Sequence, residues 1–203
     1  MKKIILALFA AISLTACAGR TNVIDTANQT AMAGMQAVMG LEYRDFEKAA
    51  TDAVESMLSS GAVSKPTGGR YVLVVSRITN DTMQRIDTDQ LIKKIRTQLL
   101  QSGKVVVTTA VGLNGAEDLM VMKARQLRQS QELNQNTVAR KGKIIAPDLS
   151  LSGKIIQKNI SLGRGKTRVE YYVQLTLSEI ETGLAFWEGE TPIIKEGKKA
   201  PIW

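Results

Sequence analysis

The first part of the chain carries apolar residues in a helical pattern and then in an extended one. Over residues 43–60, apolar side chains recur every three or four positions with charged residues between them, which predicts an amphipathic helix ended by Gly61. The β-branched run of residues 71–78 is typical of a strand buried on both faces, and the polar residues 79–86 predict a loop. The folded part of the chain is therefore expected to begin with a helix and a strand.

A second helix and a second strand follow this loop. The helix begins at Asp87, whose carboxylate can accept hydrogen bonds from the first turn, and it ends at Gly103. Residues 104–109 predict the second strand. Apolar positions recur with a helical period again over residues 115–135, so a third helix is expected there, followed by a polar stretch up to residue 143.

The last third of the chain changes to a period of two. Strands are predicted over residues 148–158, 167–180 and 184–188, with a glycine-containing turn at 161–166 between the first two. Residues 191–203 contain two prolines and three lysines and predict a loosely held tail. The element order predicts an α/β fold in which helices pack on a mixed sheet of about five strands.

The N-terminus has the pattern of a bacterial lipoprotein signal peptide. Two lysines precede an apolar run over residues 4–12, which is too short to span about 30 Å of hydrocarbon. A Leu-Thr-Ala triplet then leads to Cys17, the residue that a lipoprotein peptidase requires in diacylated form. We predict a signal peptide over residues 1–16 and lipidation of Cys17; an ordinary secretory peptide with an unrelated cysteine is the alternative.

A tether and one domain are expected after the signal peptide. Residues 17–42 are small and polar and predict a tether, and residues 43–190 predict the domain. Met32, Met35 and Met39 recur at helical spacing within the tether. We expect this segment to dock on the domain, with binding to a partner as the alternative.

The amino-acid composition limits the kinds of catalysis and binding that the chain can support. The 203 residues have a formal net charge of +8, no histidine and one cysteine, so the commonest general base and zinc ligand is absent, and lipidation of Cys17 leaves no thiolate. Aromatic residues make up 4%, which argues against nucleic-acid binding; Trp187 lies among apolar neighbours, which favours core packing over stacking on a glycan. The positive charge favours a soluble basic surface without a specific partner, and lipid headgroups, acidic proteins or glycan carboxylates as partners are the alternative.

No catalytic motif stands out. The chain has neither a Gly-x-Ser-x-Gly elbow nor a Ser-x-x-Lys pair. Residues 163–167 resemble the end of a phosphate-binding loop, but the first glycine of that motif is missing and a hairpin turn is the better interpretation. The pair Asp87 and Asp89 is explained by helix capping, and the pair Glu188 and Glu190 by a strand end beside lysines. We expect no enzymatic activity, no metal and no cofactor.

Several stretches resemble the LpoB family. They are the lipid-attachment signal with its tether and helix, the loop Thr79-Asn80-Asp81-Thr82, the strand entry Ser102–Val105, and the closing Thr-Gly and Trp-x-Gly within residues 181–190. The resemblance covers roughly residues 43–190 and implies a non-catalytic domain similar to the N-terminal domain of TolB and to the curli secretion lipoprotein. It also implies an outer-membrane lipoprotein that docks on a small accessory domain of a class A penicillin-binding protein and activates peptidoglycan synthesis.

The chain departs from the LpoB family in two ways, and one of them is that residues 141–165 are more basic than expected. The best-known relatives carry a long Pro-rich tether, whereas this chain has no proline between Cys17 and Pro66. Ala18 follows the cysteine where enterobacterial lipoproteins retained in the inner membrane carry Asp. We therefore expect the protein to be anchored by lipid in the outer membrane and to face the periplasm. We also expect it to be a monomer.

The expected partner is the synthase, and peptidoglycan is a further candidate. Charge and predicted exposure place the contact on the polar loop and the basic hairpin, through Asn80, Arg85, Arg164, Lys166, Arg168 and Tyr172. Two alternatives stay open: a structural or secretion-associated outer-membrane lipoprotein related to the curli export lipoprotein, and a peptidoglycan-binding anchor.

Overall fold

A computed structural model describes residues 38–111 and 118–198 of the chain. The chain divides into two units, and the second, residues 38–203, contains every described residue. The predictions for the signal peptide, for Cys17, for Met32 and for Met35 lie outside the described residues. Among the helices that the structure describes, none has the length and apolar character needed to cross a membrane.

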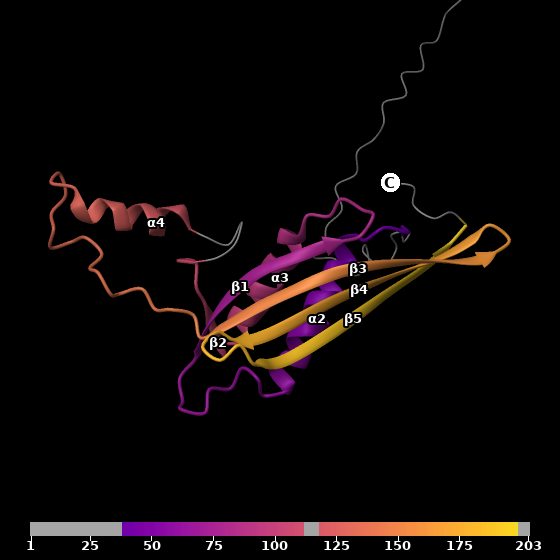
Figure 1. The fold of residues 1–203 in the computed structure, drawn as a ribbon, viewed down its shortest axis with the longest axis horizontal. Helices are drawn as coiled ribbons and strands as arrows, with labels where there is room; N and C mark the ends of the chain where they lie inside the picture. The colour runs from indigo at the N-terminus through magenta and orange to yellow at the C-terminus, as the bar shows by residue number, and fades with distance from the viewer. Residues whose placement is uncertain (1–37, 112–117, 199–203) are drawn as a thin grey trace, which may run out of the picture. The chain divides into compact units, whose positions relative to one another are not determined.

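Five strands form one mixed sheet in the order β2-β1-β3-β4-β5 (Figure 1). The strands are β1 (Tyr71–Asp81), β2 (Val105–Val107), β3 (Leu149–Gly163), β4 (Lys166–Glu179) and β5 (Ala185–Gly197). β1 pairs in parallel with β2 and β3, and β3, β4 and β5 form an antiparallel meander. The predicted fold class, helices on a mixed sheet of about five strands, is confirmed.

Helix α2, Tyr43–Ser59, forms where the apolar spacing predicts it. A capping box starts the helix: the Glu42 backbone N–H donates to Asp45 Oδ2 over 2.8 Å, and the Glu42 side chain accepts from the Asp45 backbone. Its apolar side is buried, through Phe46, Ala49, Ala50, Ala53, Val54 and Met57. The helix thus contributes one layer of the core.

Helix α3, Thr88–Gln101, packs beside α2. Asp87 caps it as predicted, because its Oδ1 accepts from the Asp89 backbone N–H over 2.9 Å. Gln98 Nε2 donates to Thr51 Oγ1 of α2 over 2.8 Å. Since α2 lies against β5 and α3 against β1 and β2, both helices cover the same face of the sheet, which we call the inner face; the opposite one is the outer face (Figure 1).

The residues of β4 alternate between these two faces. The inner-face residues are all buried: Val169, Tyr171, Val173, Leu175 and Leu177. Trp187 of β5 is only 8% exposed, and its Nε1 donates to Ser56 Oγ of α2 over 3.2 Å. The prediction that Trp187 packs in the core is therefore confirmed, while Trp203 lies outside the described residues.

Two glycines allow this close packing. Gly153 of β3 and Gly189 of β5 both pair with Leu175. A Cβ on Gly153 would lie 2.4 Å from the Gln174 carbonyl oxygen, and one on Gly189 would lie 2.3 Å from the Trp187 ring. Only glycine fits at these two positions without moving the strands or the indole.

Several predicted strand ends were wrong. β3 continues to Gly163, beyond its predicted end at residue 158, and β2 covers only Val105–Val107 of the predicted residues 104–109. β1 continues to Asp81, because Thr79, Asn80 and Asp81 pair with β3 and are not part of a loop. β5 continues to Gly197, which pairs with Thr167 of β4. The partner strands supply backbone hydrogen bonds that a polar sequence does not reveal.

The supposed tail therefore belongs to the sheet as far as residue 197. Thr191 and Ile193 are buried, whereas residues 199–203 lie outside the described part. Pro192 is compatible with this strand because β5 is an edge strand, where a missing N–H need not break the ladder. A proline in the sequence thus misled the prediction.

The predicted tether also ends earlier than residue 42. Leu41 is buried, and Met39 packs against the core. The docking expected of the methionine segment is confirmed for Met39 only, since the other two methionines are not described. The folded body begins before Tyr43.

The helix predicted over residues 115–135 is the largest error. The described helical elements there are α4, Leu119–Gln126, and the short 3₁₀ helix η1, Leu127–Gln129, and neither contains a buried residue. The Ser130 backbone has extended angles and ends the helical stretch. The apolar period is present, but the helix does not pack on the sheet, so nothing beyond local hydrogen bonds extends it.

Candidate functional site

The basic hairpin between β3 and β4 is formed as predicted. Arg164 adopts a positive φ of 50° between Gly163 and Gly165, which also have positive φ, and the three residues turn the chain. Arg164 and Lys166 are both exposed at this tip. The hairpin therefore presents two cations on a short turn at the end of two long paired strands.

Arg168 follows on the outer face but is already paired. Its Nη2 lies 2.6 Å from Glu196 Oε1 on β5, the residue opposite to it in the strand register, and its Nη1 lies 3.9 Å from Glu170. The guanidinium therefore bridges two carboxylates. Reversing its charge would place three negative groups together, so Arg168→Glu perturbs this cluster as well as any partner contact.

Tyr172 is tied to the same cluster. Its hydroxyl donates to Glu170 Oε2 over 2.7 Å. This hydrogen bond, followed by burial and by the charges of Glu170 and Glu190, raises the pKa of Tyr172. Arg168, Glu170 and Tyr172 thus form a fixed polar row along the outer face of β4.

The Asn80 side chain forms hydrogen bonds within its own loop. Its Nδ2 donates to the Gln84 carbonyl over 2.8 Å, and its Oδ1 accepts from the Thr82 backbone N–H and hydroxyl over 3.1 and 2.7 Å. These bonds use the side-chain amide to shape residues 82–86, where Arg85 is exposed. Of these two residues, Arg85 is the one whose exposed side chain is available to contact a partner, because the Asn80 amide is used within the loop.

The structure brings the six predicted residues neither to one place nor to one face: Arg164 and Lys166 lie at the hairpin tip, whereas Tyr172 lies in the middle of β4. Asn80 pairs with the buried Ile155, whereas Tyr172 pairs with Ile156, the next residue along β3. Because neighbouring strand residues point to opposite faces, Asn80 lies on the inner face and Tyr172 on the outer face. Their role in binding a partner stays a prediction.

A cluster that the sequence analysis missed holds the entry of the chain into the domain. Lys195 Nζ of β5 donates to the Gly40 carbonyl over 2.7 Å and lies 2.5 Å from Asp45 Oδ2 and 3.8 Å from Glu42 Oε1. The Lys195 side chain is only 11% exposed. We call Lys195 with Gly40, Glu42 and Asp45 the entry clasp.

Two further contacts fasten the same segment. Gln84 forms a reciprocal pair with the Leu41 backbone: Leu41 N–H donates to Oε1 over 2.8 Å, and Nε2 donates to the carbonyl over 3.0 Å. The Tyr171 hydroxyl donates to the Met39 carbonyl over 3.3 Å, and burial, followed by the charge of Asp45, raises the pKa of Tyr171 to about 12. About 150 residues separate Lys195 from its partners, so no local pattern could have indicated the clasp.

The outer face of β4 and β5 has the opposite charge to the hairpin. A shallow hollow of about 410 Å³ lies there, lined by Gln174, Leu175, Thr176, Glu188, Gly189 and Glu190. Gln174 Nε2 donates to Glu190 over 2.8 Å, so the glutamates lie within a strand and not at its end as predicted. Across residues 38–111 and 118–198, no group of three acidic or cysteine side chains could hold a metal ion.

Solved structures similar to this chain include members of one family. The C-terminal domain of LpoB from Salmonella enterica is 15% identical, with 73% of this chain and 98% of that chain covered and a TM-score of 0.43. The NMR structure of LpoB from Escherichia coli is 13% identical, with 97% and 94% covered and a TM-score of 0.41. No curated protein matches the chain.

The family assignment rests on a sequence model and not on these low structural scores. The model for the peptidoglycan-synthase activator LpoB matches residues 45–193. The match begins in the first turn of α2 and ends within β5, so it includes the whole sheet except the last residues of its edge strand. The chain belongs to the LpoB family of peptidoglycan-synthase activators.

Proposed function

We propose that this protein is an outer-membrane lipoprotein, anchored through Cys17, that binds and activates a class A penicillin-binding protein. The observation that carries the proposal is the match of the peptidoglycan-synthase activator model to residues 45–193. The lipid-attachment pattern that ends at Cys17 supports the anchor, and the family's location supports the outer membrane. The protein regulates peptidoglycan synthesis without catalysing a step.

An activator without catalytic groups can act only through differential affinity. It must bind the active arrangement of the synthase more tightly than the resting arrangement. A 100-fold stimulation requires about 2.7 kcal/mol of such preference. A rigid docking surface serves this purpose, because it does not adapt to the resting arrangement as a flexible one would.

The hairpin end of the sheet is the proposed contact with the synthase. Arg164 and Lys166 supply exposed positive charge at the hairpin tip, and Arg85 supplies it from the loop that contacts Gln157 and Asn159 of β3. Asn80 shapes the loop that carries Arg85, and the cluster of Arg168 and Tyr172 with Glu170 stiffens the outer face beside the hairpin. Such a surface fits an acidic patch on the accessory domain of the synthase and speeds the encounter between the two proteins.

The test is binding of the full chain, in detergent, to each class A synthase of the same organism. The proposal expects one synthase to bind, and it expects Lys166→Glu to weaken that binding at low salt. Lys93→Glu on α3 is the matched control, because it changes charge equally at an exposed site outside the hairpin. Equal losses for both variants would remove the hairpin from the interface, and no binding to any synthase would overturn the function.

The same preparation separates the remaining alternatives. Sedimentation with purified sacculi in the absence of a synthase would point to a peptidoglycan anchor. Assembly into large oligomers in detergent would point to a secretion component. The proposed activator is expected to do neither without its synthase.

A further inference from the structure

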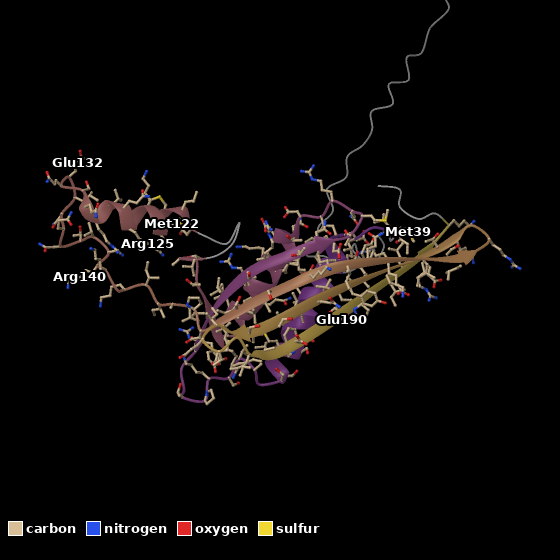
Figure 2. All side chains as sticks on the ribbon, viewed as in Figure 1. Met39, Met122, Arg125, Glu132, Arg140 and Glu190 are labelled. Carbon is tan, nitrogen blue, oxygen red and sulfur yellow. The ribbon has the colours of Figure 1, made fainter. Side chains whose placement is uncertain are left out.

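Residues 118–147 form an excursion between β2 and β3 whose apolar side chains are left uncovered. Leu119 is 76% exposed, Met120 66% and Met122 41%. They make up most of the first turn of α4, which has no charged residue between Leu119 and Met122. Figure 2 shows Met122 and Arg125 on this helix, with Glu132 and Arg140 farther along the excursion. A fully apolar turn in water is unfavourable by roughly 1 kcal/mol or more for each large side chain.

The handedness of the connections between parallel strands predicts the face of the sheet on which this excursion lies. β2 lies on one side of β1 and β3 on the other, and all three strands are parallel. The connection from β1 to β2 runs through α3 on the inner face. Connections between parallel strands are right-handed in about 98% of cases. Because the step from β2 to β3 runs back across β1, a right-handed connection must pass over the outer face.

An apolar groove is present on the outer face at this place. Its volume is about 270 Å³, and it is lined by Val72, Val106, Val107, Thr108, Ala110, Lys143, Ile144 and Ile145. Val72 and Val106 are opposite each other in the register of β1 and β2, while the neighbouring Leu73 is buried on the inner face. The end of the excursion, Ile144 and Ile145, already lies along this groove, as the connection rule requires.

The start of α4 is fastened beside the groove. The Asp118 backbone N–H donates to the Thr109 carbonyl over 2.9 Å, and Arg125 Nη2 donates to the Ala110 carbonyl over 2.8 Å. Arg125 Nε is buried without an acceptor among the described residues, so the present position of the helix leaves one donor unsatisfied. A rotation about residues 109 and 110 would move the first turn of α4 at the expense of these two hydrogen bonds but without breaking any strand pairing.

We propose that the outer face of β1 and β2 is the docking surface of α4, with Leu119 and Met122 placed in the groove beside Val72 and Val106. Leu119 and Met122 are three positions apart and lie on the same side of the helix. The helix is held to the same chain a few residues from the groove, so its effective concentration there is in the millimolar range or above. A second copy or a partner protein would have to compete against that advantage.

Charge is compatible with this docking. Among the described residues that line the groove, Lys143 is the only charged one. The cations of α4, Lys123 and Arg125, lie in its second turn, beyond the apolar first turn. Docking therefore buries apolar side chains and leaves these charges at the edge of the contact, where they keep their water.

The test is the rate of disulfide formation between cysteines placed on the two surfaces. In the full chain with Cys17→Ser, the pair Val106→Cys and Met122→Cys is compared with the pair Val106→Cys and Ala124→Cys. Residues 122 and 124 lie about 200° apart around the helix, so only residue 122 faces the groove on docking. We expect the first pair to close within one chain at least about tenfold faster than the control.

Two results would overturn the docking surface. Equal rates for the two pairs would show that α4 samples the groove without orientation. Disulfides formed mainly between two chains would show that a second copy occupies the groove. As a second variant, Leu119→Asp in the first pair is expected to remove most of its rate advantage, and this residue is exposed, so the fold does not depend on it. The proposal is independent of synthase binding.

Discussion

The sheet body and the excursion contain similar apolar residues with opposite outcomes. In β4 and α2, apolar side chains at the predicted period are buried almost completely, whereas in α4 none is buried. In the body, each helix and each strand packs against at least one other helix or strand. The apolar period of a sequence therefore predicts the local structure, but side chains become buried only where that structure packs against another surface.

The largest expected effect comes from the same substitution placed in each region. Gly153→Ala forces a Cβ to within 2.4 Å of the Gln174 carbonyl oxygen, so we expect a loss of about 3 kcal/mol in the free energy of unfolding. Gly142→Ala in the excursion meets no neighbour and strains only its positive φ, so the same free energy should change by less than about 0.5 kcal/mol. Urea unfolding followed by tryptophan fluorescence measures both. Equal losses would mean that the excursion unfolds together with the body.

The entry clasp should give the next largest effect. Lys195→Met removes the cation that neutralises Asp45 and Glu42 in a site that water barely reaches, so we expect a loss of about 2–3 kcal/mol. Lys198→Met, at an exposed position three residues later, is the control and should change stability by less than about 0.5 kcal/mol. A small effect at Lys195 would show that the clasp does not belong to the cooperatively folded body.

Alkaline pH provides a more specific test of the same contact. Burial and the charge of Asp45 raise the pKa of Tyr171 to about 12, against about 10 in the unfolded chain. The folded state therefore holds this proton more tightly, and the corresponding stability is present below about pH 10 and lost as the pH rises toward about 12. Tyr171→Phe should flatten this fall, whereas Tyr43→Phe, at a more exposed site, should leave it unchanged. Parallel slopes for the two variants would contradict the assignment.

The smallest expected effect is at the surface ion pair of Arg168 and Glu196. Both side chains are well exposed, so Arg168→Ala should cost no more than about 0.5–1 kcal/mol, and high salt should reduce that cost. Thermal unfolding at low and high salt measures it. A larger, salt-insensitive loss would mean that the cluster with Glu170 and Tyr172 supports the body and does not merely cover it.

Much of the body could be predicted from the sequence because its signals are local. The Asp87 cap, the alternation in β4 and the glycine turn at Arg164 each depend on residues close together in the chain. The strand ends could not be predicted, because β1 continues to Asp81 and β5 to Gly197 by pairing with strands that are far away in the sequence. The entry clasp was missed for the same reason.

For the six residues of the candidate site, whose role in binding stays a prediction, the sequence indicated exposure and charge but not the contacts that each side chain makes. Charge indicated the hairpin correctly as an exposed basic turn. It could not show that Asn80 is used within its loop, or that Arg168 is held by Glu196, because both depend on the strand register. The prediction for the excursion failed for the opposite reason. Its local apolar pattern was present, but the sequence does not show which surface the helix would pack against.

The activator function is tested by glycan polymerisation by each class A penicillin-binding protein of the same organism, measured against rising concentrations of the full chain in detergent. We expect a saturable stimulation of one synthase, reached at higher concentration with Lys166→Glu than with Lys93→Glu. If a correctly folded chain changes the rate of none of these synthases, the proposed activator function is contradicted, and only the fold and the family remain.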